Sequence, residues 1–416
     1  MCHFIIILNA IIGDLMNKFI FIGGIYPEFK MDEIKNKYGS LPQDAADNFQ
    51  KSIISGLEDN ILSAVTVFNT YFLPSSFFSF DKIAYYEWDG KYGKNYNLPY
   101  LRNRFLRFYS KTKSLINYIS EYIDNNCKNE TLNVIVYPAY IPFLKTIYEL
   151  KKNYKLNVCL IVPDLPEYMG LTSHRSFYNR FVEKHISNVF RKYLCYIDSF
   201  VFLTESMRSY LGFPEKPFRI IEGVAPNNYI YNPPDNKTIN RFVVYSGRLQ
   251  MRYGIDVYLK AISLIDDYSL HFDFYGTGEG VEIIKKFSQK DSRVRYMGYY
   301  LPDELHVIQQ NSLLLINPRQ NEQEFTKFSF PSKTMEYMMS GRPVIAYKLD
   351  GMPDEYMDYI LSPKDNSPEE LAKTISYYSS LPDSELKEIG LNGRKFVVDN
   401  KNARVQAQKI LELFNL

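Results

Sequence analysis

The sequence predicts an α/β protein of two domains, each built on a doubly wound parallel sheet with helices on both faces. Three observations support this fold class. The chain has 416 residues, which is too long for one ordinary core. Short apolar runs alternate with segments of helical periodicity. A stretch rich in proline and asparagine near residue 225 interrupts that alternation, which then starts again.

The first domain is expected over residues 16–225. Lys18–Ile22 is an apolar run that predicts a buried strand, and Gly23 and Gly24 follow it as a tight turn. Apolar residues at four-residue steps predict a helix over Asp44–Leu57. Further strands are predicted at Ile61–Val67, Leu132–Tyr137, Leu156–Val162 and Ser199–Leu203.

Residues 226–240 are the predicted linker, and 241–385 the predicted second domain. Its strands are expected at Phe242–Ser246, Leu270–Tyr275, Val294–Met297, Leu313–Asn317 and Pro343–Tyr347. Its helices are expected at Ile255–Ile265, Pro302–Gln310 and Pro331–Ser340. Residues 386–416 are expected to form helices that pack back towards the first domain. Two such domains imply a cleft between them, and ligands of open α/β sheets bind at the carboxyl ends of the strands.

Residues 1–15 begin with an apolar run that is similar to a signal peptide only superficially. No basic residues precede the run, and Asp14 follows it in place of a small-residue cleavage site. The run is too short to span a bilayer. Met16 is followed at once by the first predicted strand. We therefore expect residues 1–15 to be an extension outside the fold, with a membrane anchor as the alternative.

The composition excludes several classes of protein. With 46% hydrophobic and 23% charged residues the chain is globular, and a net charge of +2 gives no argument for a nucleic-acid partner. The four cysteines and five histidines show no metal-ligand spacing, and no Asp-x-Asp sequence occurs. We therefore expect no bound metal, and reduced thiols in a cytoplasmic protein.

The segment FPSKTMEY, which begins at Phe330, is the strongest local feature. Pro331 suits the first helical position, and Gly341 suits a left-handed stop. The start of this helix would offer free N–H groups, Ser332 and Lys333 to an anion. About one turn further, Glu336 could accept hydrogen bonds from two vicinal hydroxyls of a ribose. The alternative is a capped core helix whose Lys333 and Glu336 are merely solvated.

Two further motifs follow predicted strands of the second domain. The segment SGRLQMRYG contains Arg248 and Arg252 on a strand-to-helix turn, which suits a diphosphate because guanidinium groups bind phosphate oxygens bidentately. The segment YGTGEG has glycines that would let the backbone approach a base or a phosphate. Its candidate residues are Gly276, Thr277 and Gly278. The GxGxxG fingerprint of a nicotinamide dehydrogenase does not follow the first strand.

Taken in order, these motifs resemble the donor-binding domain of retaining glycosyltransferases of family four, whose GT-B fold has two Rossmann-like domains. The resemblance covers residues 241–356. It rests on SGR, YGTGEG, YMGY (Tyr296–Tyr299), NPR (Asn317–Arg319), FPSKTMEYMMSGRPVIA and DGMPDE (Asp350–Glu355). In the first half, FIGGIYP, DAADNFQKSIISGLE and IVPDLPEYM are similar to the acceptor domain of capsule, exopolysaccharide and O-antigen enzymes in that family.

The resemblance implies a role for each candidate residue. Arg248 would hold the donor diphosphate with Lys333 and Ser332 beside it, and Glu336 would bind the ribose. Tyr253 stands where the family has a lysine, so Arg252 is the candidate substitute. Gly23 and Gly24 would approach the donor phosphates, and a tight turn is their alternative role.

The chain departs from the family pattern at two places. Phe328 stands at the first glutamate of the family's Glu-x7-Glu motif, so Glu322 and Glu324 are candidate replacements. Many relatives have a histidine where this chain has Pro163 and Asp164. Asp164 would orient the donor sugar or the acceptor hydroxyl, or else it is an ordinary turn residue.

The implied activity is that of a hexosyltransferase-type glycosyltransferase (EC 2.4) acting with retention. A nucleotide-diphosphate sugar would be the co-substrate, and a saccharide or lipid-linked saccharide would be the acceptor. On this account neither a protein nucleophile nor a metal cofactor is required. Two alternatives stay open: a GT-B nucleotide-sugar 2-epimerase, and a non-catalytic partner subunit that keeps the fold.

Two stretches, Tyr100–Lys113 and His174–Tyr193, mix basic and aromatic residues. Such segments can lie on an anionic membrane surface, which would suit a lipid-linked acceptor and a protein peripheral to the cytoplasmic face. On this hypothesis, charge reversal at Arg104, Arg107 and Lys111 should abolish binding to anionic vesicles. The alternative is solvated helix faces whose aromatic residues belong to the core.

Overall fold

The computed structural model describes residues 18–39, 41–74, 81–127, 129–165, 189–212, 215–226, 229–232, 241–321 and 324–416. The chain forms two compact units. The first contains the residues up to Val224 together with Ala403–Leu416, and the second contains Ala225–Asn402. The predicted extension at residues 1–15 lies outside the described residues.

The first unit is built on an eight-stranded sheet in the order β10-β9-β8-β7-β1-β2-β5-β4. Every neighbouring pair is parallel except β4 and β5. The strands are β1 (Phe19–Gly23), β2 (Val65–Asn69), β4 (Tyr86–Asp89), β5 (Lys94–Asn97), β7 (Leu132–Val136), β8 (Leu156–Val162), β9 (Ser199–Phe202) and β10 (Phe218–Ile220). A separate antiparallel pair consists of β3 (Lys82–Ile83) and β6 (Tyr100–Leu101).

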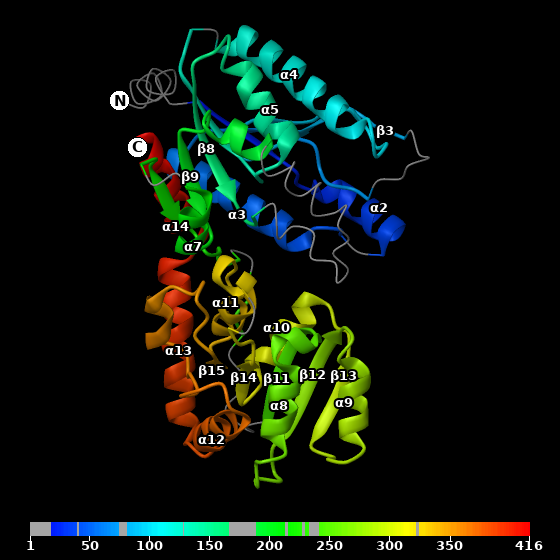
Figure 1. Ribbon diagram of the computed structural model, residues 1–416, viewed down its shortest axis with the longest axis vertical. Helices are drawn as coiled ribbons and strands as arrows, with labels where there is room; N and C mark the ends of the chain where they lie inside the picture. The colour runs from blue at the N-terminus through cyan, green and yellow to red at the C-terminus, as the bar shows by residue number, and fades with distance from the viewer. Residues whose placement is uncertain are drawn as a thin grey trace, which may run out of the picture. The chain divides into compact units, whose positions relative to one another are not determined.

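Helices cover both faces of the first sheet, with α3 and α14 on one face and α4 and α5 on the other (Figure 1). The helices are α2 (Glu28–Tyr38), α3 (Asp44–Ile61), α4 (Arg107–Asn126), α5 (Ile141–Leu150), α7 (Glu205–Leu211), α14 (Ala403–Leu411) and the 3-10 turn η4 (Glu412–Phe414). At the contact of α3 with α14, a Cβ atom added at Gly56 would lie 2.1 Å from the carbonyl oxygen of Ala403. Glycine is therefore required for this close approach.

The second unit is built on a five-stranded, wholly parallel sheet in the order β13-β12-β11-β14-β15. The strands are β11 (Phe242–Arg248), β12 (His271–Thr277), β13 (Val294–Gly298), β14 (Leu314–Asn317) and β15 (Val344–Ala346). The helices are α8 (Ile255–Ile262), α9 (Val281–Ser288), α10 (Pro302–Gln310), α11 (Ser332–Met339), α12 (Pro368–Ser379) and α13 (Asp383–Asn400), with 3-10 turns η1 (Met251–Tyr253), η2 (Glu324–Phe328) and η3 (Asp354–Asp358).

Each face of the second sheet has its own apolar core. One core packs Val243 and Phe272 of the strands against α8, α9 and α12. The other packs Val244 and Leu315 against α11 and α13. Because consecutive strand residues point to opposite faces, a fully apolar strand buries both. The predicted fold class, two doubly wound α/β domains with parallel sheets, is confirmed.

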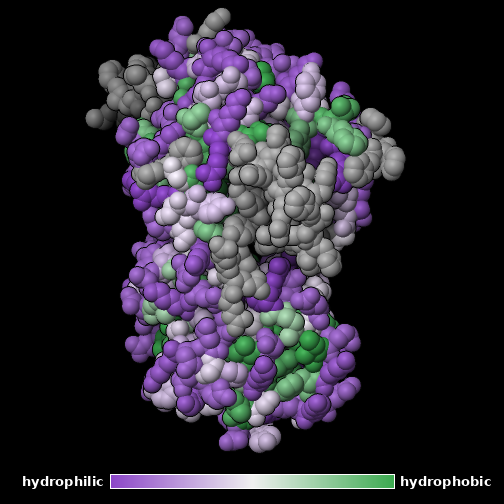
Figure 2. Space-filling view, in the orientation of Figure 1, coloured by the Kyte–Doolittle hydropathy of each residue, from purple (hydrophilic) through white to green (hydrophobic). Residues whose placement is uncertain are grey.

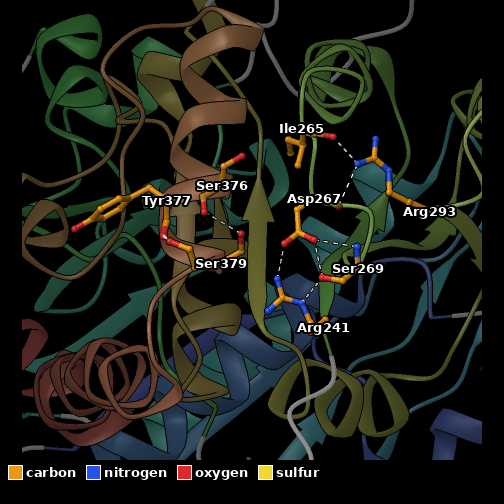
Figure 3. Close-up of polar contacts among 9 residues, drawn as sticks. Arg241, Ile265, Asp267, Ser269, Arg293, Ser376, Tyr377 and Ser379 are labelled. Atoms are coloured by element: carbon orange, nitrogen blue, oxygen red, sulfur yellow. Dashed lines mark hydrogen bonds and ion pairs between the residues drawn. The ribbon is translucent and has the colours of Figure 1, made fainter.

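A polar network closes the second sheet where β11, β12 and β13 begin (Figure 3). The guanidinium of Arg293 donates to the carbonyl oxygens of Ile262 (3.0 Å) and Ile265 (2.5 Å) at the end of α8. It also forms an ion pair with Asp291 at 2.7 Å. Arg241, just before β11, forms an ion pair at 2.6 Å with Asp267, which lies in the loop between α8 and β12. This network lies at the amino ends of the strands, opposite to the candidate site.

Several predicted boundaries are corrected. Residue Ile61 ends α3 and does not belong to the following strand. Pro331 precedes α11 as its N-cap, whereas Gly341 has the expected positive φ of 71°. The predicted segment 386–416 is divided, because α13 stays with the second unit. There a Cβ atom at Gly390 would lie 2.2 Å from the carbonyl oxygen of Gly341, so α13 packs directly on the turn after α11.

Candidate functional site

Two of the glycine-containing motifs lie side by side at the carboxyl ends of β11 and β12. Gly247 pairs with Gly276, and Arg248 pairs with Thr277. Gly276 has a φ of 129°, and a Cβ atom there would lie 1.8 Å from the carbonyl oxygen of Gly247. Gly278 has a φ of 151°, and a Cβ atom there would lie 2.3 Å from the carbonyl oxygen of Leu249 in the loop that follows β11. These glycines are therefore required for the two loops to pack against each other.

Helix α11 brings the third motif to the same place. Its Tyr337 accepts a hydrogen bond from the backbone N–H of Ser246 and donates to the carbonyl oxygen of Ser246, both at 2.8 Å. The Cε atom of Lys333 lies 3.3 Å from where a Cβ atom of Gly247 would stand. The structure thus brings together SGR, YGTGEG and the start of α11, as the sequence predicted.

Lys333 and Glu336 form an ion pair with each other in the structure. Their predicted partners, a phosphate for Lys333 and a ribose for Glu336, stay predictions. Lys333 Nζ lies 2.9 Å and 2.8 Å from the two carboxylate oxygens of Glu336. The buried Gln309 of α10 donates to Glu336 Oε1 at 2.8 Å and to Ser246 Oγ at 3.1 Å. A ligand that engages either charge must therefore compete with this ion pair.

Three arginines lie at or shortly after the carboxyl ends of the neighbouring parallel strands β11 and β14. Arg248 is exposed, and its side chain makes no hydrogen bond or ion pair within the described part of the chain. Arg252 is also exposed and donates to Gln250 Oε1 at 3.0 Å. Arg319, which follows β14, is half-buried and donates to Ser329 Oγ at 2.7 Å. Burial lowers the pKa of Arg319, and the nearby Arg252 lowers it further.

Arg319 is a candidate that sequence reasoning missed as a site residue. Its guanidinium lies 5.6 Å from the ring centroid of Tyr253, the residue that stands in place of the family's lysine. The signal was present in the NPR motif at the end of a predicted strand, but only the fold shows how near it lies to Tyr253. Of the other candidates, Ser332 is exposed at the start of α11 and Glu324 begins η2, whereas Glu322 lies outside the described residues.

A second missed residue is His306 of α10. Its ring lies 4.5 Å from that of Tyr229. Burial lowers the pKa of the His306 imidazole, opposed by the nearby carboxylates of Glu336 and Asp303 and assisted by Lys333. The pKa of His306 is therefore influenced by the charged groups of the candidate site. A lone histidine in the sequence does not indicate such a neighbourhood.

Gly23 and Gly24 of the first unit lie in a tight turn, which is one of their two expected roles, and their approach to the donor phosphates stays a prediction. The N–H groups of Gly24, Ile25 and Tyr26 donate to side-chain oxygens of Gln50 (2.9 Å), Asn69 (2.7 Å) and Asp47 (2.6 Å). A Cβ atom at Gly23 would lie 2.5 Å from Gln50 Oε1, and one at Gly24 would lie 2.5 Å from the ring of Phe72. In this structure the loop N–H groups are satisfied internally, so the glycines serve packing of the loop.

Asp164 lies just beyond the carboxyl end of β8, and its side chain is exposed. Desolvation by the surrounding protein nevertheless raises the pKa of its carboxyl to about 6. A carboxyl with this pKa would gain or lose its proton close to neutral pH, which is compatible with a functional role.

The predicted basic and aromatic surface is corrected at Lys111. This residue is only 2% exposed, and its ammonium donates to the carbonyl oxygen of Thr70 at 2.9 Å. It lies over the rings of Phe72 and Tyr100, at 4.7 Å and 4.2 Å from their centroids. Burial holds the pKa of Lys111 well below its ordinary value. Lys111 therefore cannot touch a membrane surface, and its charge reversal would damage the fold instead.

The residues just before Lys111 are accessible. The exposed apolar side chains are those of Phe105 (74%), Leu106 (41%), Phe108 (37%) and Tyr109 (66%). In Figure 2, hydrophobic surface is visible on the first unit where Figure 1 places the amino-terminal end of α4. The second predicted stretch lies outside the described residues from 174 to 188. None of the helices formed by described residues is long and apolar enough to cross a membrane. Those residues also contain no group of three or more potential metal ligands.

The fold is that of GT-B proteins of known structure. Sucrose-phosphate synthase from Thermosynechococcus elongatus superposes with a TM-score of 0.60 at 15% identity, covering 96% of this chain and 98% of that one. The pneumococcal O-GlcNAc transferase GtfA, solved with UDP and GlcNAc, gives a TM-score of 0.56 at 12% identity, covering 96% and 99%. S. aureus TarM, solved with UDP among its ligands, gives 0.52 at 16% identity, covering 77% of this chain but only 62% of TarM.

The family comparison falls on the second unit. Residues 240–380, which are 141 of the 416 residues, match the family model described as "Glycosyl transferases group 1". No curated protein has a significantly similar sequence. The matched residues include all the motifs that meet at the candidate site. The family match is thus confined to the second unit, and the solved structures share the fold of this chain.

Proposed function

We propose that the protein transfers a hexosyl group, with retention, from a nucleotide-diphosphate sugar to a hydroxyl of a saccharide or lipid-linked saccharide, as capsule and O-antigen enzymes do. One observation carries the donor half of the proposal. The motifs SGR, YGTGEG and SKTME come from three places in the sequence and meet at the carboxyl ends of β11 and β12. Ligands of open parallel sheets bind at this edge.

The chemistry of the meeting point suits a nucleoside diphosphate. Arg248, Lys333 and Arg319 supply positive charge for the diphosphate, because guanidinium and ammonium groups bind phosphate oxygens strongly. Glu336 supplies carboxylate oxygens for the vicinal hydroxyls of the ribose. UDP is the first nucleotide to test, since the similar GtfA and TarM structures contain it.

The proposed reaction needs no covalent intermediate on the protein and no metal. The bond between the anomeric carbon and the diphosphate oxygen breaks, and the acceptor oxygen bonds to the same face of that carbon. The acceptor proton passes to the departing phosphate. Positive side chains stabilise the charge that grows on the leaving diphosphate, and the protein otherwise acts by positioning the reactants. Asp164 is proposed to orient the donor sugar or the acceptor hydroxyl.

Donor binding tests the proposal directly. We expect Arg248→Ala and Glu336→Ala each to raise the Kd of the preferred nucleotide sugar by about 10-fold or more, since a hydrogen bond to a charged group contributes roughly 1.5–3 kcal/mol. The measurement is calorimetric titration over a panel of UDP-, GDP- and ADP-sugars. Arg241→Ala is the matched control, because Arg241 is a partly exposed arginine before the amino end of β11.

The outcomes separate the alternatives. If Arg248→Ala and Glu336→Ala change the donor Kd no more than Arg241→Ala does, the donor-site assignment is wrong. Conversion of the sugar without acceptor would identify an epimerase. Donor binding without transfer to any acceptor would favour the non-catalytic partner subunit.

We further propose that residues 104–109, which comprise the segment before α4 and the first turn of that helix, contact the anionic cytoplasmic face of a membrane. Exposed aromatic side chains there stand beside Arg104 and Arg107, the combination that favours binding at a lipid interface. Such a contact would bring the protein to a lipid-linked acceptor.

We expect the intact protein to co-sediment with mixed phosphatidylglycerol and phosphatidylcholine vesicles. Arg104→Glu with Arg107→Glu should weaken binding by about 30-fold or more, at about 1 kcal/mol for each cationic side chain lost. Tyr109→Ser should also weaken binding, whereas Tyr377→Ser, which replaces a similarly exposed tyrosine of α12 (60%), should not. Equal binding to pure phosphatidylcholine, or none to either vesicle, would contradict the proposal.

A further inference from the structure

Gln309 stands between two motifs of the candidate site without belonging to either. Its side chain is fully buried, with 0% exposure. Its amide nitrogen donates to Glu336 Oε1 at 2.8 Å and to Ser246 Oγ at 3.1 Å. Ser246 is also fully buried and is held on its other side by Tyr337. The glutamine thus links β11, α10 and α11 through one buried amide.

The remaining partner of Glu336 is Lys333, whose ammonium already gives two of its three donors to this carboxylate. A diphosphate bound by Lys333 would draw these donors away from Glu336, and the hydrogen bond from Gln309 is the side-chain contact of the carboxylate that such a change leaves intact. That bond holds Oε1 and leaves Oε2 to accept from a ribose hydroxyl. A buried, packed donor with a fixed partner is able to set the direction of a half-exposed carboxylate.

We propose that Gln309 is a positioning residue that holds the Glu336 carboxylate in the orientation that binds the donor ribose when Lys333 turns to the diphosphate. The inference rests on the proposed function, because it assumes that this site binds a nucleotide sugar. Gln309 itself does not touch the donor and acts through Glu336.

The adjacent Gln310 provides a matched control. It is 2% exposed, and its amide binds the carbonyl oxygen of Ile230 and the N–H of Asn232, at 3.0 Å and 2.7 Å. Gln309→Met and Gln310→Met each replace one buried amide of α10 by an apolar chain of similar length. Loss of general stability should be comparable, but only Gln309→Met should raise the Kd and KM for the donor, by about 10-fold. The turnover number at saturating donor should change less.

Gln309→Glu gives a readout that a merely structural role would not change. While the new carboxyl keeps its proton it donates to Glu336 as the amide does, and when it ionises two carboxylates repel. We expect near wild-type donor affinity at about pH 5 and at least 10-fold weaker affinity at about pH 8. The other titratable groups facing Glu336 are Lys333, His306, Tyr229 and Tyr337. Because the wild type and the variant both contain these groups, the ratio of the variant Kd to the wild-type Kd is measured at each pH.

Binding is followed with UDP, GDP and ADP as probes on the full chain. The inference is overturned if Gln309→Met and Gln310→Met affect the Kd alike, or if the Gln309→Glu ratio does not depend on pH, while Glu336→Ala still weakens binding. If Glu336→Ala has no effect either, the proposed donor site falls together with the inference. The two failures are thereby distinguished.

Discussion

Replacing Lys333 by alanine is expected to reduce kcat/KM for sugar transfer by about 10²–10³-fold, as removal of one charge-stabilising donor does in other enzymes. The reason is the place of Lys333, whose stem packs on Gly247 at the end of β11 while its ammonium lies half-exposed beside the loops of the site. Without the Lys333 ammonium, the negative charge that develops on the departing diphosphate in the transition state would lose one stabilising positive charge.

The variant should remain folded, which makes the activity loss interpretable. The pair of Lys333 with Glu336 is an i, i+3 contact with 37% and 28% exposed side chains, and such pairs contribute only about 0.2–0.5 kcal/mol. Lys333→Arg keeps the charge and should recover part of the activity. A double-mutant cycle with Glu336→Ala separates the ion pair from the donor contacts. Retention of activity within a few-fold in Lys333→Ala would refute the assignment.

The largest expected loss of stability comes from Arg293→Ala, which should destabilise the second unit by about 3–5 kcal/mol. Arg293 is 5% exposed on its side chain and joins the end of α8 to the start of β13. Without it, the carbonyl oxygens of Ile262 and Ile265 and the carboxylate of Asp291 lose their shared donor. The carbonyl oxygen of Ile262 keeps the N–H of Ile265, and Asp291 keeps the backbone N–H of residue 293. The penalty of desolvation therefore falls mainly on the carbonyl oxygen of Ile265 and on the Asp291 carboxylate, which loses its charged partner.

Arg241→Ala is the control for this prediction. The Arg241 side chain is 38% exposed and forms its ion pair with Asp267 near the surface, so we expect its removal to lower the unfolding free energy by less than about 1 kcal/mol. Melting of the full chain should fall by roughly 10 °C for Arg293→Ala and little for Arg241→Ala. Faster amide exchange in α8 and β12 should accompany only the first change. Equal decreases of the melting temperature in the two variants would show that the buried hydrogen bonds of Arg293 do not add to stability.

The ion pair of Arg293 with Asp291 predicts how the stability of the protein depends on pH. Arg293 lowers the pKa of the Asp291 carboxyl below its ordinary value. A lowered folded-state pKa stabilises the protein above the unfolded-state pKa, near 3.9, and that stabilisation is lost as the pH falls through the folded-state value. The difference between wild type and Arg293→Ala should therefore narrow below about pH 4.

The second unit followed closely from the sequence because β11, β12, β14 and β15 consist mostly of buried residues, and β11 and β12 contain the glycines of the turns that follow them. Helix α10 begins and ends where the apolar pattern placed it, at Pro302 and Gln310. By contrast, β4, β5 and the pair β3–β6 were not predicted. These strands are short and partly exposed at the edge of the first unit, so their sequences lack a continuous apolar run.

Individual site residues were harder to place than the elements that carry them. Lys111 could have been assigned to the core, because it stands four residues before Leu115 and eight before Ile119, both on the buried face of α4. The stacking of Arg319 on Tyr253 could not, since the two residues follow different strands and meet only in the folded sheet. Nor does a glycine in a sequence show which neighbours require it, as the close contacts of Gly23 with Gln50 and of Gly24 with Phe72 illustrate.

The division of the chain has a consequence for its synthesis. Helix α14 supplies Ala407, Ile410 and Leu411 to the core of the first unit, yet it follows the whole of the second unit in the sequence. On a ribosome, the part of the first unit's core that α14 covers beside α3 must stay exposed until residues 403–416 have emerged. The second unit is contiguous and is completed earlier. Although it begins later in the chain, it is expected to finish folding first.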